Sequence, residues 1–135
     1  MRILNILYLT ILIGLLSFSF SCNGTGSNDN NDLNIKADAY AALEPDIKTV
    51  ILDVRTDREF SQGHLEKAIL MDIYKPDFKD QAAVFDKDLT YYVYCSTGVR
   101  SLHAVKYLRS IGILKSFNIE GGINRLAREG VKIVD

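Results

Sequence analysis

The chain has 135 residues, a formal net charge of −1 and hydrophobic residues at 47% of its positions. This length has room for one domain, and removal of an N-terminal leader would still leave enough residues to bury a core. Lys and Arg are scattered along the sequence, which is unlike the clustered basic surface of a nucleic-acid-binding protein, so we expect no nucleic acid partner.

The first residues of the chain, 1–21, have the layout of an export signal. A positive charge at Arg2 precedes the stretch 3–16, which is almost entirely apolar. Cys22 follows directly, and residues 23–32 are polar and rich in Gly and Asn. A segment of that composition cannot bury a core, so we expect a flexible tether at 22–32 and one folded domain at 33–135.

A hydrophobic stretch, then a cysteine, then a polar tether resembles the bacterial lipoprotein signal. The resemblance implies a lipid on Cys22, which would make the protein a periplasm-facing lipoprotein held at a membrane of the bacterial cell envelope. Ser19 and Ser21 also fit the small-x-small pattern of ordinary signal cleavage, which would release a soluble protein. An uncleaved anchor helix is the third reading, but spanning a bilayer takes about 20 apolar residues and serines interrupt this stretch. All three readings export the domain.

Beyond the tether, short β-branched or aromatic runs alternate with helical patterns, which predicts an α/β fold with a largely parallel sheet. We expect roughly five strands. The strands assigned from the pattern are 49–54, 68–71, 91–94 and 116–119.

Helices are predicted between these strands, at 36–43, from Thr56 to Phe60, after Gly98 and at 123–128. Thr56 and Glu59 have the spacing of a capping box, which places a helix start there. Apolar residues recur at helical spacing after Gly98 and predict a buried stripe. The stripe consists of Val99, Leu102, Val105, Leu108 and Ile111, and Gly112 is placed to end that helix.

Cys95 ends a predicted strand, and its loop runs directly into the next helix. The carboxyl ends of parallel strands face the ligand crevice, and the start of a helix stabilises an anion there. Small residues and Gly98 allow a backbone nest around the sulfur, which predicts a lowered thiol pKa and a nucleophilic Cys95. The alternative is an inert buried thiol that packs like a small hydrophobe. Such a cysteine would not need this loop, so we favour a functional one.

Three blocks of the segment 36–135 resemble the rhodanese-homology domains. The blocks are residues 51–65, 92–101 and 120–122. The resemblance implies a three-layer α/β sandwich in which helices flank a five-stranded parallel sheet. It also implies that Cys95 accepts a sulfane sulfur as a persulfide and passes it to a nucleophile, which would make the protein a sulfurtransferase.

The length of the loop distinguishes two chemistries that share this architecture. Phosphatases of the related cell-cycle type have one residue more between the cysteine and the arginine, and so enclose a phosphate. Here the residues between Cys95 and Arg100 are Ser96, Thr97, Gly98 and Val99, which is the sulfurtransferase length. A cysteine-dependent phosphatase stays the enzymatic alternative, and a partner-binding or redox-sensing module is the non-catalytic one.

Other candidate site residues follow from these blocks. We expect the substrate to contact Arg55 and the loop residues Ser96, Thr97, Gly98, Val99, Arg100 and Ser101, with Arg100 also supporting the loop. Asp53 is expected to pair structurally with Arg55. His64 is expected to bond backbone atoms in a turn rather than to act as a general base.

No metal or nucleotide cofactor is expected, because neither metal-ligand spacing nor a glycine-rich nucleotide fingerprint occurs. The partners that the resemblance implies are a small sulfur donor, such as thiosulfate, and a thiol or cyanide acceptor. A protein acceptor of unknown identity is a further alternative.

Overall fold

The computed structural model describes residues 33–44 and 46–135. The predicted export signal, Cys22 and the predicted tether lie outside the described residues. Within the described ranges, no helix has both the length and the apolar character needed to cross a membrane.

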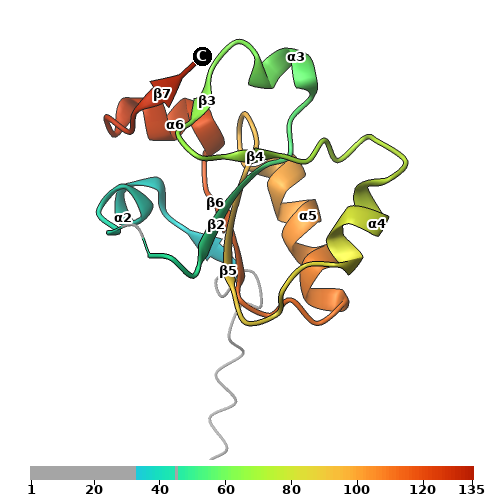
Figure 1. Cartoon of the computed structure of the whole chain (residues 1–135). Helices are drawn as coiled ribbons and strands as arrows, with labels where there is room; N and C mark the ends of the chain where they lie inside the picture. The colour runs from blue at the N-terminus through green and yellow to red at the C-terminus, as the bar shows by residue number, and fades with distance from the viewer. Residues whose placement is uncertain (1–32, 45) are drawn as a thin grey trace, which may run out of the picture.

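Five parallel strands form a central sheet in the order β1-β6-β5-β2-β4 (Figure 1). The strands are β1 (Asn34–Ile35), β2 (Thr49–Asp53), β4 (Ile69–Leu70), β5 (Thr90–Tyr94) and β6 (Ser116–Ile119). The α/β class and the parallel sheet are therefore confirmed, and all four strands assigned from the sequence are present. The fifth strand, β1, has only two residues and carries no alternation that a sequence pattern could reveal.

Helices cover both faces of the sheet (Figure 1). They are α2 (Ala37–Ala41) and α6 (Gly122–Arg128) on one face, and α4 (Phe78–Ala83) and α5 (Val99–Ser110) on the other. Successive residues of β5 alternate between the two layers, as the period of a strand requires. Tyr91 and Val93 pack in the α4–α5 core, whereas Tyr92 and Tyr94 pack against the α2–α6 core.

The ends of the helices follow the signals in the sequence. The short helix α3 (Asp57–Phe60) begins with the predicted capping box, in which the Glu59 amide donates to Thr56 Oγ1 at 3.3 Å. Helix α5 ends in a Schellman motif, because the Gly112 amide donates to Arg109 O and the Ile113 amide to Leu108 O, both at 3.0 Å. Gly112 has φ +94°, a conformation that favours glycine.

The predicted stripe of α5 is wrong at its first position. Val99 is 62% exposed, and Leu102 and Ile111 are only half-buried. The face against the sheet carries the small residues Ser101 and Ala104, both 0% exposed. Small side chains let the start of α5 lie close to the end of β5, where a periodicity of large apolar residues could not reveal the contact.

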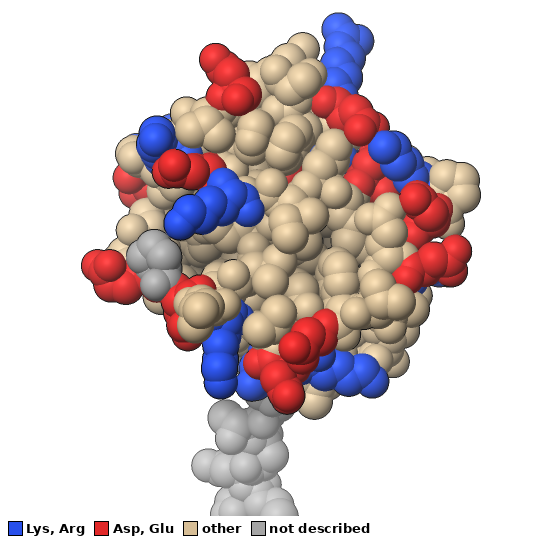
Figure 2. Space-filling model, in the orientation of Figure 1, with Lys and Arg blue, Asp and Glu red and all other residues tan. Residues whose placement is uncertain are grey.

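An antiparallel pair, β3 (His64–Leu65) with β7 (Ile133–Val134), was not assigned from the sequence. It ties the C-terminal segment to the turn after α3. The face of the molecule in Figure 2 mixes acidic and basic side chains around its edge and leaves its middle, over β4, β2 and β5, uncharged. A groove of about 630 Å³ opens on the α2 side of the sheet, lined in part by Tyr40, Ile51 and Tyr92, and it does not reach Cys95.

Candidate active site

Three segments that are distant in the sequence meet at the carboxyl end of the sheet, beyond neighbouring strands. They follow β2, β5 and β6, and each leads into a helix: α3, α5 and α6 (Figure 1). Cys95 is the first residue after β5. Because all the strands are parallel, their carboxyl ends share one edge, which is where α/β sheets hold ligands.

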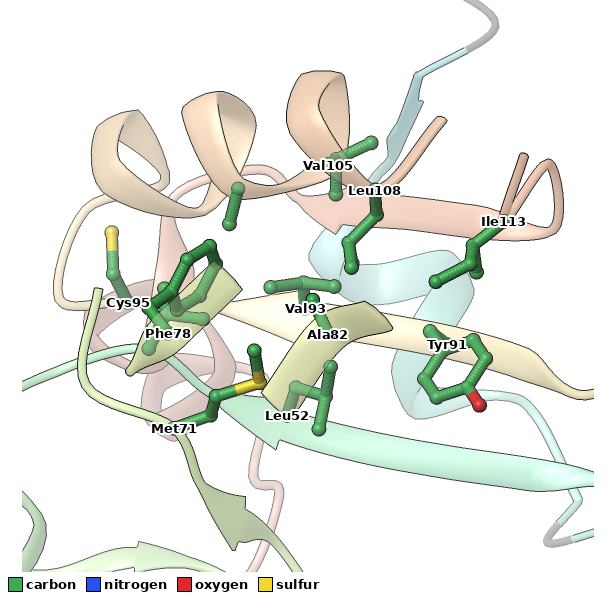
Figure 3. Close-up of a cluster of buried hydrophobic side chains, with 12 residues drawn as sticks. Leu52, Met71, Phe78, Ala82, Tyr91, Val93, Cys95, Val105, Leu108 and Ile113 are labelled. Atoms are coloured by element: carbon green, nitrogen blue, oxygen red, sulfur yellow. The ribbon is translucent and has the colours of Figure 1, made fainter. Parts of the chain in front are cut away.

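The Cys95 sulfur lies at the end of the α4–α5 core and is turned toward the first turn of α5 (Figure 3). The residue is 1% exposed and forms no disulfide. Sγ accepts a hydrogen bond from the Gly98 amide at 3.1 Å and one from Ser101 Oγ at 3.4 Å. The Gly98 amide belongs to the loop after Cys95 and Ser101 to the first turn of α5, so the sulfur accepts from one backbone amide and one hydroxyl.

Two opposing effects act on the pKa of the Cys95 thiol. Burial raises the pKa, because a low-dielectric surrounding disfavours the thiolate. Hydrogen bonds from the Ser101 hydroxyl and from the amides of Ser101, Thr97 and Gly98 lower it, and together they outweigh burial. The pKa is therefore below the ordinary value of a cysteine, which is the condition for a nucleophilic thiolate near neutral pH.

The start of α6 bonds to the backbone of the loop that carries Cys95. The Ile123 amide donates to Cys95 O at 2.8 Å, and the Asn124 amide donates to Ser96 O at 3.3 Å. Gly122 has φ +56°, and a Cβ atom there would overlap Cys95 O and come within 2.8 Å of Thr97 N. Only glycine permits this approach, because it lacks a Cβ atom and tolerates a positive φ.

The role of Gly122 could not be read from its position in the sequence. Two consecutive glycines before a predicted helix indicate a backbone requirement, but not which segment approaches them. Gly98 also lies close to the segment before α6. Its φ is +94°, and a Cβ atom there would lie 3.1 Å from Gly121 N.

Arg100 is held by Glu59 of α3. Its Nη1 donates to Glu59 Oε2 at 2.8 Å and its Nη2 to Oε1 at 2.6 Å, which makes a two-bond pair. Ser96 Oγ joins the pair by donating to Glu59 Oε1 at 2.7 Å and accepting from Arg100 Nη2 at 2.9 Å. The hydrogen bonds from Arg100 are the main cause that lowers the pKa of Glu59, and Glu59 in turn raises the pKa of Arg100. The sequence reasoning used Glu59 only as a capping residue and missed this second role.

Arg55 lies in a separate, buried pair. Its Nη2 donates to Asp53 Oδ2 at 2.6 Å and to Gly63 O at 2.7 Å, and its Nε also donates to Asp53. Arg55 is 5% exposed and Asp53 is 0% exposed. The structure thus contains the expected Asp53–Arg55 pair, and substrate contact by Arg55 stays a prediction.

His64 stacks on the Phe60 ring at 3.7 Å between centroids, and its Nδ1 lies 3.2 Å from Phe60 O. Thr97 and Val99 are exposed on the outer side of the loop. Among the described residues, no group of His, Cys, Asp or Glu is arranged to hold a metal ion.

Comparison with known proteins gives a consistent family. The profile of the rhodanese-like domain matches residues 36–129. YtwF of Bacillus subtilis, whose name carries a provisional sulfurtransferase assignment, is 35% identical over 102 residues, which cover 73% of this chain and 94% of that protein. The tRNA uridine(34) hydroxylase of Sodalis glossinidius is 31% identical over 100 residues, and the matched part is only 28% of that enzyme.

Solved structures support the same fold. A rhodanese-like domain protein from Staphylococcus aureus is 33% identical and superposes with a TM-score of 0.62, covering 76% of this chain and 98% of that one. A rhodanese-related protein from Thermoplasma volcanium is 29% identical with a TM-score of 0.64, covering 75% of this chain and 96% of the other.

Proposed function

The chain belongs to the rhodanese-like domain family, and from this membership we propose that it is a sulfurtransferase that carries a sulfane sulfur on Cys95. The observation that carries the proposal is the set of hydrogen bonds that converge on one buried sulfur. The Gly98 amide and the Ser101 hydroxyl both donate to Sγ, and the loop amides lower the pKa of the thiol. A structural cysteine would not need this arrangement.

The proposed reaction has two displacement steps. The Cys95 thiolate attacks the outer sulfur of a donor such as thiosulfate, so that an Sγ–S bond forms, the donor S–S bond breaks and sulfite leaves with the electron pair. The persulfide anion that results extends from Sγ into the loop, whose amides favour negative charge. Cyanide or an acceptor thiolate then attacks the outer sulfur, and the Cys95 thiolate leaves.

The direct test is the mass of the intact protein. The family profile covers residues 36–129, and the protein without residues 1–21 contains all of them together with the predicted tether. Treatment of this protein with thiosulfate or a persulfide should add the mass of one sulfur, and cyanide should remove it as thiocyanate. Cys95→Ser should show no gain, whereas a gain that persists in this variant would refute the assignment to Cys95.

Phosphatase activity is the alternative to be measured beside it. Four residues separate Cys95 from Arg100, and Arg100 is engaged by Glu59 instead of closing the ring around an oxyanion. We therefore expect Cys95-dependent sulfur release and no Cys95-dependent hydrolysis of p-nitrophenyl phosphate. Hydrolysis without sulfur transfer would reverse the proposal.

We further propose that residues 1–21 direct export and that Cys22 receives a lipid, which would hold the domain at the periplasmic side of a membrane. The sequence layout supports this proposal: a positive start, an apolar stretch and a polar segment after the cysteine. Mass spectrometry of the protein purified from cell envelopes should find a diacylglyceryl-modified Cys22 at the mature N-terminus. A soluble periplasmic form cleaved before an unmodified Cys22 would contradict it.

A further inference from the structure

The groups that donate hydrogen bonds to the Cys95 sulfur are uncharged. The Gly98 amide and the Ser101 hydroxyl donate to Sγ, and none of the four residues that follow Cys95 is ionisable. Neutral donors of this kind stabilise one negative charge on one sulfur atom. They provide little for a second negative charge carried by the rest of a donor molecule.

The loop has one cation, Arg100, and Glu59 neutralises it. Both terminal nitrogens of Arg100 bond to the Glu59 carboxylate, at 2.8 and 2.6 Å, and Nη2 also bonds to Ser96 Oγ. The pair is partly shielded, with side-chain exposures of 22% for Arg100 and 30% for Glu59. The guanidinium also lies over the Tyr74 ring, 5.9 Å from its centroid. An arginine in these contacts has little free charge to offer a dianion.

Glu59 is itself fixed from behind. Thr56 Oγ1 donates to Oε2 at 2.8 Å and the Thr56 amide donates to the same oxygen at 3.1 Å. The carboxylate is therefore held between the start of α3 and the loop. Because Thr56 already holds Oε2, the carboxylate is fixed in place and can keep both of its hydrogen bonds to the Arg100 guanidinium.

We propose that Glu59 is a specificity-determining residue: by neutralising Arg100 it makes the Cys95 site take sulfur from monoanionic or neutral persulfides in preference to the dianion thiosulfate. The inference rests on the proposed sulfurtransferase function. With a persulfide R–S–SH, the Cys95 thiolate attacks the outer sulfur, the S–S bond of the donor breaks, and the thiolate R–S⁻ leaves with the electron pair. The outer proton passes to the leaving thiolate, so the products are the Cys95 persulfide anion and a thiol, and no further oxidant or reductant is needed.

The first measurement uses the wild-type protein without residues 1–21. The second-order rate constant for loading Cys95 is followed by intact mass, with thiosulfate and with cysteine persulfide, whose ammonium group offsets its carboxylate. We expect cysteine persulfide to load the protein about tenfold faster or more, because a tenfold rate difference corresponds to about 1.4 kcal/mol, less than two unit charges in contact near a protein surface exchange. Faster loading by thiosulfate would overturn the inference and leave the proposed function intact. Failure of both donors would instead refute the proposed function.

The second measurement changes the charge of Glu59 alone. In Glu59→Gln the guanidinium of Arg100 keeps its positive charge without a carboxylate partner, so the ratio of thiosulfate to persulfide loading rates should rise by about tenfold. A role limited to holding the loop would lower both rates and leave their ratio unchanged, and that result would overturn the inference.

The matched control is Glu66→Gln. The Glu66 side chain is 57% exposed and pairs with Lys132 at 3.5 Å, not with Arg100. It removes the same charge from the protein, so its donor ratio should equal that of the wild type. An equal rise in both variants would assign the effect to net charge and overturn the inference. Should Glu59→Gln be unfolded by circular dichroism, the wild-type comparison still tests the donor preference on which the assignment to Glu59 depends, because faster loading by thiosulfate would overturn it.

Discussion

Two arginine–carboxylate pairs lie at the carboxyl end of the sheet and differ in what surrounds them. The Asp53–Arg55 pair is buried, with side-chain exposures of 0% and 7%, and Gly63 O is a further partner of the guanidinium. The Glu59–Arg100 pair is partly exposed and includes a hydroxyl of the Cys95 loop. The same ionic contact thus holds the scaffold in one place and the reactive loop in the other.

The difference lies in the consequence of losing one partner. A buried charge that loses its counter-ion cannot be solvated by water instead, so the buried Asp53–Arg55 pair, the scaffold pair, is expected to govern folding. Water can replace much of the interaction within the partly exposed Glu59–Arg100 pair, the loop pair. This pair is therefore expected to contribute little to stability and to act on the chemistry of the site. The predictions below test this division.

The largest effect is expected at the scaffold pair. Asp53→Asn should lower the free energy of unfolding by about 3–5 kcal/mol, because Arg55 would stay buried without a counter-charge. Urea denaturation followed by circular dichroism measures this loss. Glu59→Gln under the same conditions should cost less than about 1 kcal/mol.

A double replacement sharpens that result. Asp53→Leu combined with Arg55→Met removes both charges, so it should be clearly more stable than Asp53→Asn. If the double variant is as unstable as the single one, the loss belongs to packing or to the bond with Gly63 O, and the contrast between the two pairs fails.

The glycines at the two ends of α6 give the next effect. In Gly130→Ala the new Cβ atom has open space around it, so the substitution costs only the strain of a φ of +80°, about 1–2 kcal/mol. In Gly122→Ala the residue has the strain of a φ of +56°, and the new Cβ atom also overlaps Cys95 O. Gly122→Ala should therefore lose more unfolding free energy than Gly130→Ala in the same urea titration.

The two glycine variants should also differ at the site. Gly122→Ala displaces the loop that carries Cys95 and should slow sulfur loading, whereas Gly130→Ala should load at the wild-type rate. Equal stability and equal loading in the two variants would show that the start of α6 does not set the position of the loop.

Ser101 provides a smaller, chemical effect. The Ser101 hydroxyl donates to Sγ and is one of the hydrogen bonds that lower the pKa of the thiol, so Ser101→Ala should raise the pKa of Cys95. The pH dependence of alkylation by iodoacetamide reports the thiolate fraction. Its midpoint should lie below that of free cysteine in the wild type and move upward in Ser101→Ala.

Ser110→Ala is the control for the thiol measurement. Ser110 ends the same helix, is exposed and donates to Tyr107 O, so it has no contact with the sulfur. Its alkylation midpoint should equal that of the wild type. A midpoint that is unchanged in Ser101→Ala as well would mean that the backbone amides alone set the pKa of Cys95.

The smallest effect concerns acid. Because the pKa of Glu59 is lowered in the folded protein, mainly by hydrogen bonds from Arg100, its stabilising contribution is complete above the unfolded pKa of about 4.3. The contribution is lost as the pH falls toward the lower folded value. The unfolding free energy of the wild type should therefore exceed that of Glu59→Gln by about 0.5–1 kcal/mol at pH 6, and by less at pH 3. A constant difference across that range would show that charge is not its source.

Local signals determined a large part of this protein. The strand 116–119, the capping box of Thr56 and the end of α5 at Gly112 each follow from neighbouring residues, and the structure contains all three. Cys95 can be identified as a functional residue for the same reason, because a strand, a short loop with glycine and a helix start are consecutive in the sequence. Propensity, capping and turn chemistry act over a few residues, so they can be read without the fold.

Tertiary structure decided what contacts the loop. Glu59 meets Arg100 across 41 positions of sequence, and Gly122 meets Cys95 from a different strand end. The burial of Ser101 instead of Val99 likewise depends on how closely α5 approaches β5. Such contacts form only because parallel strands bring their carboxyl ends to one edge, and no local pattern encodes which side chains then face one another.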